Sequence, residues 1–155
     1  MIHEVITIHT DGGCSGNPGP GAWAWVLEQG GKVTERSGFC PVTTNNRMEL
    51  TAVIDALTFA EGLASSTGGK PCVINLHTDS RYVQQGISSW IKKWVKNNWL
   101  TANREPVKNQ DLWKNLLALD ASLKVTWHWV RGHVGNELNE ACDALVQQEI
   151  KKNRP

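Results

Sequence analysis

The sequence lacks the features that mark several classes of protein. Its cysteines, Cys14, Cys40, Cys72 and Cys142, form no C-x-x-C pair, and this spacing argues against a zinc ribbon and against a small disulfide-bonded scaffold. No run reaches the roughly 18 apolar residues that span a membrane. The N-terminal residues show no basic segment followed by an apolar one, as secretion signals do. We therefore expect a soluble, cytoplasmic protein in a reducing compartment, without a membrane partner.

The chain also has little net charge and little repetition. Its formal net charge is +1 over 155 residues, so any surface that binds a polyanion must be a local patch. We find no internal repeat, and low-complexity sequence is confined to the short stretch 65–69. With 40% hydrophobic residues, the chain is long enough to bury a core, and we expect residues 1–155 to form a single domain.

The spacing of apolar residues predicts both strands and helices. Strands are expected over 4–11, 22–28 and 32–42, as an antiparallel meander, and again over 72–76 and 125–130. Helices are expected over 45–63, 80–86, 88–97, 109–120 and 137–150. Asn46, with Glu49 three residues later, forms a capping pattern for the first helix. Strands separated by helices imply an α/β fold whose mixed sheet contains at least one parallel pair.

Two of the predicted strands end in the same way. I-T-I-H-T-D closes the first strand on Asp11, and I-N-L-H-T-D closes a later one on Asp79. Because side chains alternate between the faces of a strand, each aspartate shares a face with the histidine two residues before it, His9 or His77. If these strands are parallel neighbours in register, both carboxylates lie on one sheet face at the carboxyl end, where open α/β sheets place ligands.

Two carboxylates this close repel each other and raise each other's pKa, a cost that a divalent cation with oxygen ligands removes. Magnesium is the natural candidate. The alternative is that each aspartate caps the segment that follows it, Gly12-Gly13 or the helix from Ser80. The repeated pattern favours a shared site, and His9 and His77 are interpreted as core residues or residues packed beside that site.

Three further residues are candidates for the same site. Glu49 is predicted in the first turn of its helix, on the side of the apolar residues Val53 and Ala56, and a charge placed only for the helix dipole would not need to face inward. Asp143 flanks the apolar face of the last helix and, alone, reads as a surface acid. His133 lies in the glycine-bracketed loop 131–136, where it either transfers protons or is solvated.

Two segments have features of nucleic-acid binding. The glycine-rich stretch 12–21 is not a phosphate loop, because it lacks the Gly-Lys-Ser/Thr ending and leads into a strand, but its backbone could approach a nucleic acid closely. Residues 90–108 form a basic patch in which cations face a single acid, Glu105. Trp90 and Trp94 are expected there either to pack internally or to stack on sugars or bases. The cations of the patch are Lys92, Lys93, Lys96, Arg104 and Lys108.

Four separated motifs resemble the ribonuclease H family of the bacterial type 1. They are T-D-G-G-C-S-G-N-P-G-P-G at 10–21, T-T-N-N-R-M-E-L at 43–50, T-D-S-R-Y-V at 78–83 and R-G-H-V-G-N-E-L-N-E-A-C-D at 131–143. The resemblance runs from about residue 4 to residue 150 and includes a basic handle at about 88–108. It implies a ribonuclease H-like fold, a five-stranded mixed sheet in the order 3-2-1-4-5 flanked by helices.

The resemblance also implies an activity. The expected reaction is endonucleolytic hydrolysis of the RNA strand of RNA/DNA hybrids, leaving 5′-phosphate and 3′-hydroxyl ends. A monomer is the default expectation for the assembly state. Two Mg²⁺ ions, for which Mn²⁺ is a possible substitute, would be held by four carboxylates. Asp11 would bridge both ions, Glu49 and Asp79 would complete one site, and Asp143 would help to hold the other. His133 would assist proton transfer or product release.

Substrate contacts are implied in the same way. Minor-groove contacts, where 2′-hydroxyl groups distinguish RNA from DNA, are expected from Cys14, Asn17, Asn45 and Asn46. Contacts with the DNA strand are expected from Thr44 and from the handle residues Trp90, Lys92, Lys93, Lys96 and Trp99. Two residues depart from the family pattern: Gly13 stands where serine is frequent, and Arg81 stands where glutamine is frequent and would add a phosphate contact.

Two other hypotheses remain open at this point. The chain could be a binding module of the same fold with an inactive site, or a related nuclease that cuts DNA, such as a resolvase-like enzyme. Intact carboxylates favour an active enzyme over a binding module. The N-N-R-M-E-L segment and the basic handle favour recognition of a hybrid over recognition of duplex DNA.

Overall fold

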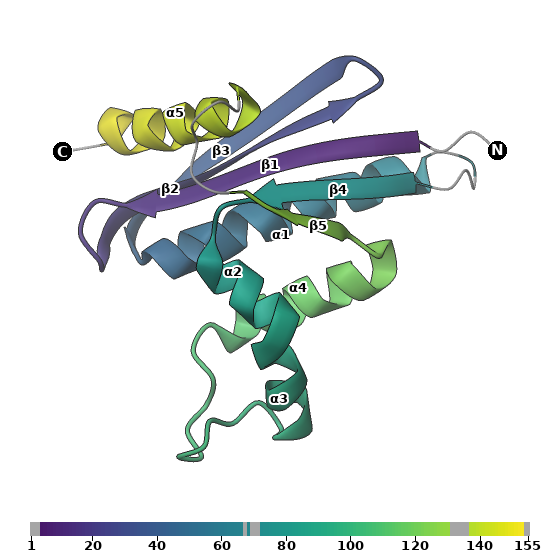
Figure 1. The fold of residues 1–155 in the computed structure, drawn as a ribbon. Helices are drawn as coiled ribbons and strands as arrows, with labels where there is room; N and C mark the ends of the chain where they lie inside the picture. The colour runs from purple at the N-terminus through teal and green to yellow at the C-terminus, as the bar shows by residue number, and fades with distance from the viewer. Residues whose placement is uncertain (1–3, 67, 69–71, 131–136, 154–155) are drawn as a thin grey trace.

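The structure, a computed structural model, describes residues 4–66, 68, 72–130 and 137–153 (Figure 1). The predicted strands and helices are present, with most boundaries shifted by a few residues. In chain order the elements are β1 (Glu4–Cys14), β2 (Gly19–Gln29), β3 (Lys32–Thr43), α1 (Asn45–Ser65), β4 (Cys72–Thr78), α2 (Arg81–Gln85), the π-helical turn η1 (Gly86–Trp90), α3 (Ile91–Lys96), α4 (Gln110–Leu123), β5 (Thr126–Trp129) and α5 (Glu137–Lys152).

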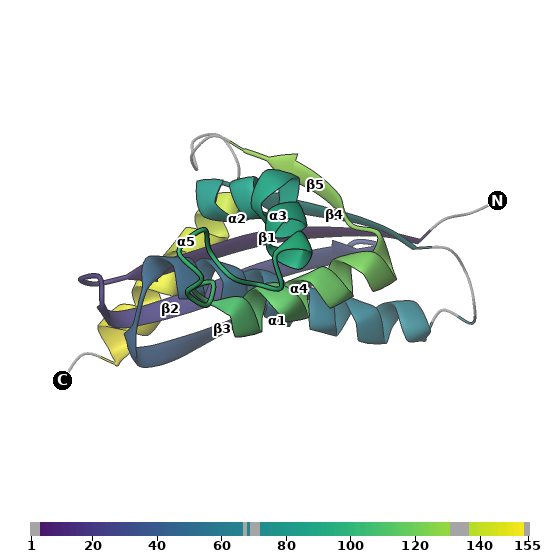
Figure 2. The same cartoon turned by 90° about the horizontal axis from the view of Figure 1, so that it is seen from below.

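The five strands form one sheet in the order β3-β2-β1-β4-β5, which confirms the order that the family resemblance implied. β1, β2 and β3 pair antiparallel as the predicted meander, whereas β4 is parallel to both β1 and β5. α5 lies on one face over β1, β2 and β3, and α1 and α4 lie on the opposite face (Figures 1 and 2). The carboxyl ends of the parallel strands β1 and β4 therefore meet at one edge of this layered arrangement.

The main hydrophobic core lies between the sheet and α1. Alternate residues of β1, Ile6 and Ile8, and of β4, Ile74 and Leu76, are buried on this face. α1 buries residues three and four apart on the side that meets them: Leu50, Val53, Ile54, Ala56, Leu57 and Ala60. Removing this apolar surface from water is the main stabilisation of both elements and holds α1 against the strands.

The start of α1 differs from the prediction. Thr44, in an extended conformation, is the N-cap, and its hydroxyl accepts a hydrogen bond from the Arg47 amide at 3.3 Å. The predicted cap at Asn46 is wrong, because the helix already begins at Asn45 and the cap must precede it. Glu49 consequently lies in the second turn rather than the first. A role as a first-turn charge favourable to the helix dipole therefore does not apply to it.

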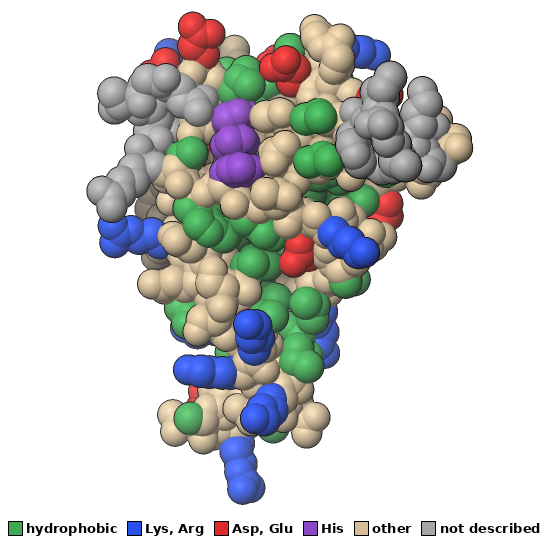
Figure 3. Space-filling model, turned by 45° about the vertical axis from the view of Figure 1, so that its right-hand side comes forward, with side chains coloured by type: hydrophobic (Ala, Val, Ile, Leu, Met, Phe, Trp, Pro, Cys, Tyr) green, Lys and Arg blue, Asp and Glu red, His purple; other side chains and the backbone are tan. Residues whose placement is uncertain are grey.

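The basic handle is an extension of the helical run α2–η1–α3, which projects from the body beneath the sheet (Figure 1). Aromatic packing holds the handle against the body of the protein. The centroid of the Trp94 ring lies 5.4 Å from that of Trp113 and 5.8 Å from that of Trp90. Gly86 permits this contact, since a Cβ there would collide with the Trp113 ring. Trp94 therefore has the packing role. Lys and Arg side chains gather on the part of the surface farthest from the sheet (Figure 3).

In the described part of the chain, no helix combines the length and the apolar character that crossing a membrane requires.

Candidate active site

The four predicted carboxylates come together. Asp11 in β1, Glu49 in α1, Asp79 after β4 and Asp143 in α5 all line one cavity of about 510 Å³. Four segments that are far apart in sequence thus contribute one acid each. Such a concentration of carboxylates in one hollow is costly without a cation, and it is the main chemical feature of the cavity.

The register of β1 and β4 accounts for the central pair. The two strands pair in parallel from Glu4 with Cys72 through His9 with His77. Asp11 and Asp79 follow the two histidines by two residues each, on the same face of the sheet. The alignment that the repeated H-T-D pattern predicted is therefore confirmed.

Glu49 reaches the pair because α1 approaches β1 unusually closely. A Cβ atom on Gly12 would collide with the Met48 carbonyl carbon and with the Glu49 amide nitrogen. Glycine at position 12 therefore allows the backbone of α1 to lie directly against β1, next to Asp11. The hydroxyl group of Ser80 donates a hydrogen bond to the Glu49 carboxylate. Glu49 is thus held from both the strand side and the start of α2.

The electrostatics of the cavity fit a cation site. Burial raises the pKa of Asp11 to about 8, and the charges of Asp79, Asp143 and Glu49 act in the same direction, against a hydrogen bond from the Gly12 amide. Burial also raises the pKa of Glu49, an effect that the Ser80 hydrogen bond opposes and Asp79 reinforces. Without a cation, the site therefore relieves its charge by retaining protons. Carboxylate oxygens are the ligands that hard divalent cations prefer.

The carboxylates are not already arranged to coordinate one metal ion. Among the described residues, no group of three or more histidine, cysteine, aspartate or glutamate side chains is arranged to hold a metal ion as it stands. The oxygen donors, with the raised pKa of Asp11 and of Glu49, fit a divalent cation, and the side chains would have to move together to bind it. The structure shows an open carboxylate cleft.

The residues expected in the minor groove lie around the start of α1, beside the carboxylates. Asn45 and Asn46 line the same cavity as the acids. Asn17, in the β1–β2 turn, accepts a hydrogen bond from the Asn45 amide at 3.3 Å. Cys14 donates from its Sγ to the Thr43 carbonyl at 3.3 Å. The β1–β2 hairpin and the helix start therefore form one continuous polar rim.

The other predicted contacts are spread more widely. Thr44 adjoins this rim and uses its hydroxyl oxygen to cap α1. The handle residues lie elsewhere, in η1 (Trp90), in α3 (Lys92, Lys93 and Lys96) and after it (Trp99). His133 lies outside the described residues.

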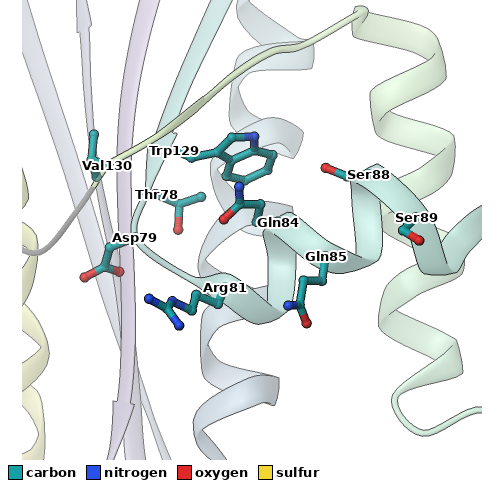
Figure 4. A pocket seen from close by; sticks show the side chains of 9 residues that line it. All are labelled: Thr78, Asp79, Arg81, Gln84, Gln85, Ser88, Ser89, Trp129 and Val130. Carbon is teal, nitrogen blue, oxygen red and sulfur yellow. The ribbon is translucent and has the colours of Figure 1, made fainter.

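The two departures from the family pattern have different surroundings. A Cβ on Gly13 would lie 3.3 Å from Val146 Cγ1 of α5, a tight contact that a small shift of the Val146 side chain would relieve. Arg81 lines the carboxylate cavity and also a neighbouring cavity of about 890 Å³, together with Asp79. In Figure 4 the guanidinium group of Arg81 extends toward the side of Asp79. Among the described residues that line the carboxylate cavity, Arg81 is the one cation.

Sequence reasoning did not assign every residue that lines the carboxylate cavity, and Ser80 and Gln147 are two polar residues that it missed. Ser80 is buried, caps α2 by accepting a hydrogen bond from the Val83 amide at 3.1 Å, and also contacts Glu49. Gln147 follows Asp143 by one helical turn. Both had a signal in the sequence, since Ser80 follows a strand-end aspartate at a helix start and Gln147 is four residues from a candidate ligand.

The chain is similar to known proteins along nearly all of its length. The family model described as RNase H matches residues 3–151. A protein named Ribonuclease H from Treponema denticola is 54% identical, over 95% of this chain and 98% of that protein. A protein named Ribonuclease HI from Caulobacter vibrioides is 49% identical, over 97% of this chain and 95% of that protein. The similarity is therefore not confined to the motifs.

Solved structures agree with the fold. LC9-RNase H1, described as a type 1 RNase H with the type 2 active-site motif, superposes with a TM-score of 0.79 at 28% identity, over 99% of this chain and 75% of that chain. LC11-RNase H1, crystallised with an RNA/DNA hybrid, has a TM-score of 0.72 at 22% identity, over 95% of this chain and 97% of that chain. With the family model matched along nearly all of its length and close relatives of the same name, this chain belongs to the ribonuclease H family.

Proposed function

We propose that this chain is an active ribonuclease H that hydrolyses the RNA strand of RNA/DNA hybrids and leaves 5′-phosphate and 3′-hydroxyl ends. The observation that carries the proposal is the convergence of four carboxylates on one cavity, in a chain about half identical to proteins of that name. A binding module would have no need to keep such a costly group of charges together.

Two Mg²⁺ ions, or Mn²⁺ in their place, would be held by Asp11, Glu49, Asp79 and Asp143, with Asp11 shared. When bound, the ions would lower the pKa of an attacking water and stabilise the leaving oxygen. The chain's own contribution is to hold the acids in place: β1 and β4 position Asp11 and Asp79, and Gly12 lets Glu49 approach them. His133, from its motif, is proposed to assist proton transfer or product release.

Substrate recognition is proposed to use two separate surfaces. The polar rim of Cys14, Asn17, Asn45 and Asn46 would read the minor groove, and Thr44 would meet a phosphate of the DNA strand. Arg81, beside the acids, would add a phosphate contact. Lys92, Lys93 and Lys96, all exposed on α3, would grip the DNA strand with Trp90 and Trp99. Residues 1–155 are proposed to act as one domain and as a monomer, in the cytoplasm, because the cysteine spacing suits a reducing compartment.

The activity is tested with a hybrid labelled separately on each strand. Wild-type protein with Mg²⁺ is expected to cut only the RNA strand, and Asp11→Asn is expected to abolish cutting while the thermal unfolding of the protein stays cooperative. Retained activity in Asp11→Asn, or equal cutting of duplex DNA, would contradict the proposal. Hybrid binding without cleavage by the wild type would identify a binding module instead.

The handle is tested by replacing Lys92, Lys93 and Lys96 together with alanine. We expect weaker hybrid binding and a salt dependence whose slope falls by about 0.9 for each phosphate contact that is lost. The matched control replaces Lys32, Lys124 and Lys151, three exposed lysines outside the handle. If both triple variants show the same salt slope, α3 does not contact the substrate.

A further inference from the structure

Three histidines form a stack on the face of the sheet that carries the catalytic aspartates. His9, His77 and His128 are direct neighbours across β1, β4 and β5. Their rings lie 4.5 Å apart at interplanar angles of 9° and 12°. Figure 3 shows histidine side chains in a column on this side of the molecule, although His9 itself is largely buried. The proposed function gives this column no role.

The column is tied to α5 at one end. The His9 Nδ1–H group donates a hydrogen bond of 2.6 Å to the Asn139 side-chain oxygen, and both residues are buried. Because the Asn139 atom is a carbonyl oxygen, which only accepts, the His9 ring nitrogen is the donor of this bond. The thiol of Cys142, one helical turn further on, donates to the His9 backbone carbonyl at 3.2 Å. One residue of β1 thus contacts two successive turns of α5.

Apolar packing beneath α5 is modest by comparison. In the described residues, the buried cluster under this helix consists of Ala22 and Ala24 from β2 with Val146 and Ile150. Two of these side chains are alanines, which interdigitate little with a helix and leave its position along its own axis weakly defined. A directional hydrogen bond between two buried groups fixes the position of α5 along its axis, which the smooth alanine surface does not.

The bond lies close to the acids on both sides. Asp143 follows Asn139 by four residues, roughly 6 Å along a helix, and Asp11 follows His9 by two residues, roughly 7 Å along a strand. The bond from His9 to Asn139 therefore closes a short bridge between the two elements that carry these carboxylates. A shift of α5 along its axis would move Asp143 relative to Asp11 directly.

We infer that His9 and Asn139 are a positioning pair that fixes α5 so that Asp143 faces Asp11 across the metal cleft. The inference rests on the proposed function, because it assigns the pair a purpose in cation binding. His77 supports His9 by stacking, and the outer ring of the column is held independently, since His128 Nε2–H donates to the Asn75 side-chain oxygen at 2.9 Å. His128 and Asn75 contact each other on β5 and β4, away from α5.

The histidines at the two ends of the column each donate to an asparagine, and this similarity provides a matched control. His9→Phe keeps a flat ring in the column and removes the donor to Asn139, and His128→Phe makes the same change at the end that does not reach α5. Ser37→Ala is a second control: it removes the 3.0 Å hydrogen bond to Glu149, which holds α5 further along its length. Asn139→Ala tests the bond from the helix side, although Asn139 has other interactions as well.

Two measurements separate positioning from general loosening. In the metal-free protein, hydrogen exchange followed by mass spectrometry is expected to accelerate in the first turns of α5 for His9→Phe, and not for His128→Phe. In the hybrid cleavage assay, His9→Phe is expected to raise the Mg²⁺ concentration for half-maximal activity by about 10-fold to 100-fold, the range typical of groups that orient metal ligands. KM for the hybrid at saturating Mg²⁺ is expected to stay near the wild-type value. The double variant with Asn139→Ala should show the same Mg²⁺ concentration as the more affected single variant.

The outcomes are decisive in each direction. An equal Mg²⁺ requirement in wild type, His9→Phe and Asn139→Ala overturns the inference, and so does an equal increase in His128→Phe or Ser37→Ala. If His9→Phe does not fold, Asn139→Ala decides by the same measurements. If the wild type has no Mg²⁺-dependent activity, the proposed function fails, while the exchange of α5 in the metal-free variants still shows whether His9 positions this helix.

Discussion

Binding of Mg²⁺ to the carboxylate cavity should release a proton from Asp11. Burial and three neighbouring acids raise the pKa of this carboxyl to about 8, so at pH 7 the metal-free protein carries about 0.9 proton on Asp11. A cation coordinated by the carboxylate displaces that proton. Metal affinity should therefore weaken about tenfold for each unit by which the pH falls below 8, over the range in which Asp11 alone titrates.

Isothermal titration calorimetry measures this proton directly. The apparent enthalpy of Mg²⁺ binding, plotted against the ionisation enthalpy of the buffer, should have a slope equivalent to about 0.9 proton at pH 7 and about 0.1 at pH 9. Because the pKa of Glu49 is also raised, its contribution would add to the release. Asp11→Asn removes the main ionisable group and is the control. A slope near zero for the wild type at pH 7 would refute the electrostatic description of the cavity.

Three other consequences concern stability. Asp11→Asn should stabilise the metal-free protein at pH 9 by up to about 5 kcal/mol, the free energy of a shift of about four pKa units, since the stability that Asp11 contributes below pH 3.8 is lost as the pH rises through about 8. Urea unfolding that shows no gain would contradict this. Burial lowers the pKa of His77 to about 4, so the stability that the neutral ring contributes above pH 6.5 should be lost as the pH falls toward 4. The expected loss is about 1 kcal/mol, after allowance for the partial exposure of the ring. The His77→Asn variant should lack this loss. Lys124 ends α4 with φ 53°, so Lys124→Gly should raise the free energy of unfolding by about 0.5–1 kcal/mol, whereas Lys124→Ala should not.

The central pair of the site could be predicted from the sequence by a local argument. Asp11 and Asp79 close the same sequence pattern, although β1 continues past Asp11 to Cys14, and period-two alternation fixes which side chains share a face. The observed pairing of His9 with His77 confirms the register. Glu49 was inferred from its inward direction on a helix, but its approach depends on the absence of a side chain at Gly12, which periodicity does not show. The position of Asp143 came from the family resemblance alone.

The histidine column shows what such reasoning cannot reach. The phase of each strand places His9, His77 and His128 on sheet faces, but only the strand order and the register of β5 make them neighbours. These are properties of the whole sheet, determined by packing between distant segments. The same holds for the Arg47 side chain, which bonds to Asp111 at 3.1 Å and joins the start of α1 to α4. The N-cap was misplaced for a simpler reason, because Thr44 and Asn46 are both good capping residues two positions apart.

The most direct test of the proposed catalytic site is a crystal structure of this chain with a bound RNA/DNA hybrid and Ca²⁺, a hard cation that prefers the same oxygen ligands as Mg²⁺. We expect anomalous density for cations between an RNA-strand phosphate and the carboxylates of Asp11, Glu49, Asp79 and Asp143. Cations absent from these carboxylates, or a hybrid whose DNA strand occupies the cavity, would contradict the proposed site.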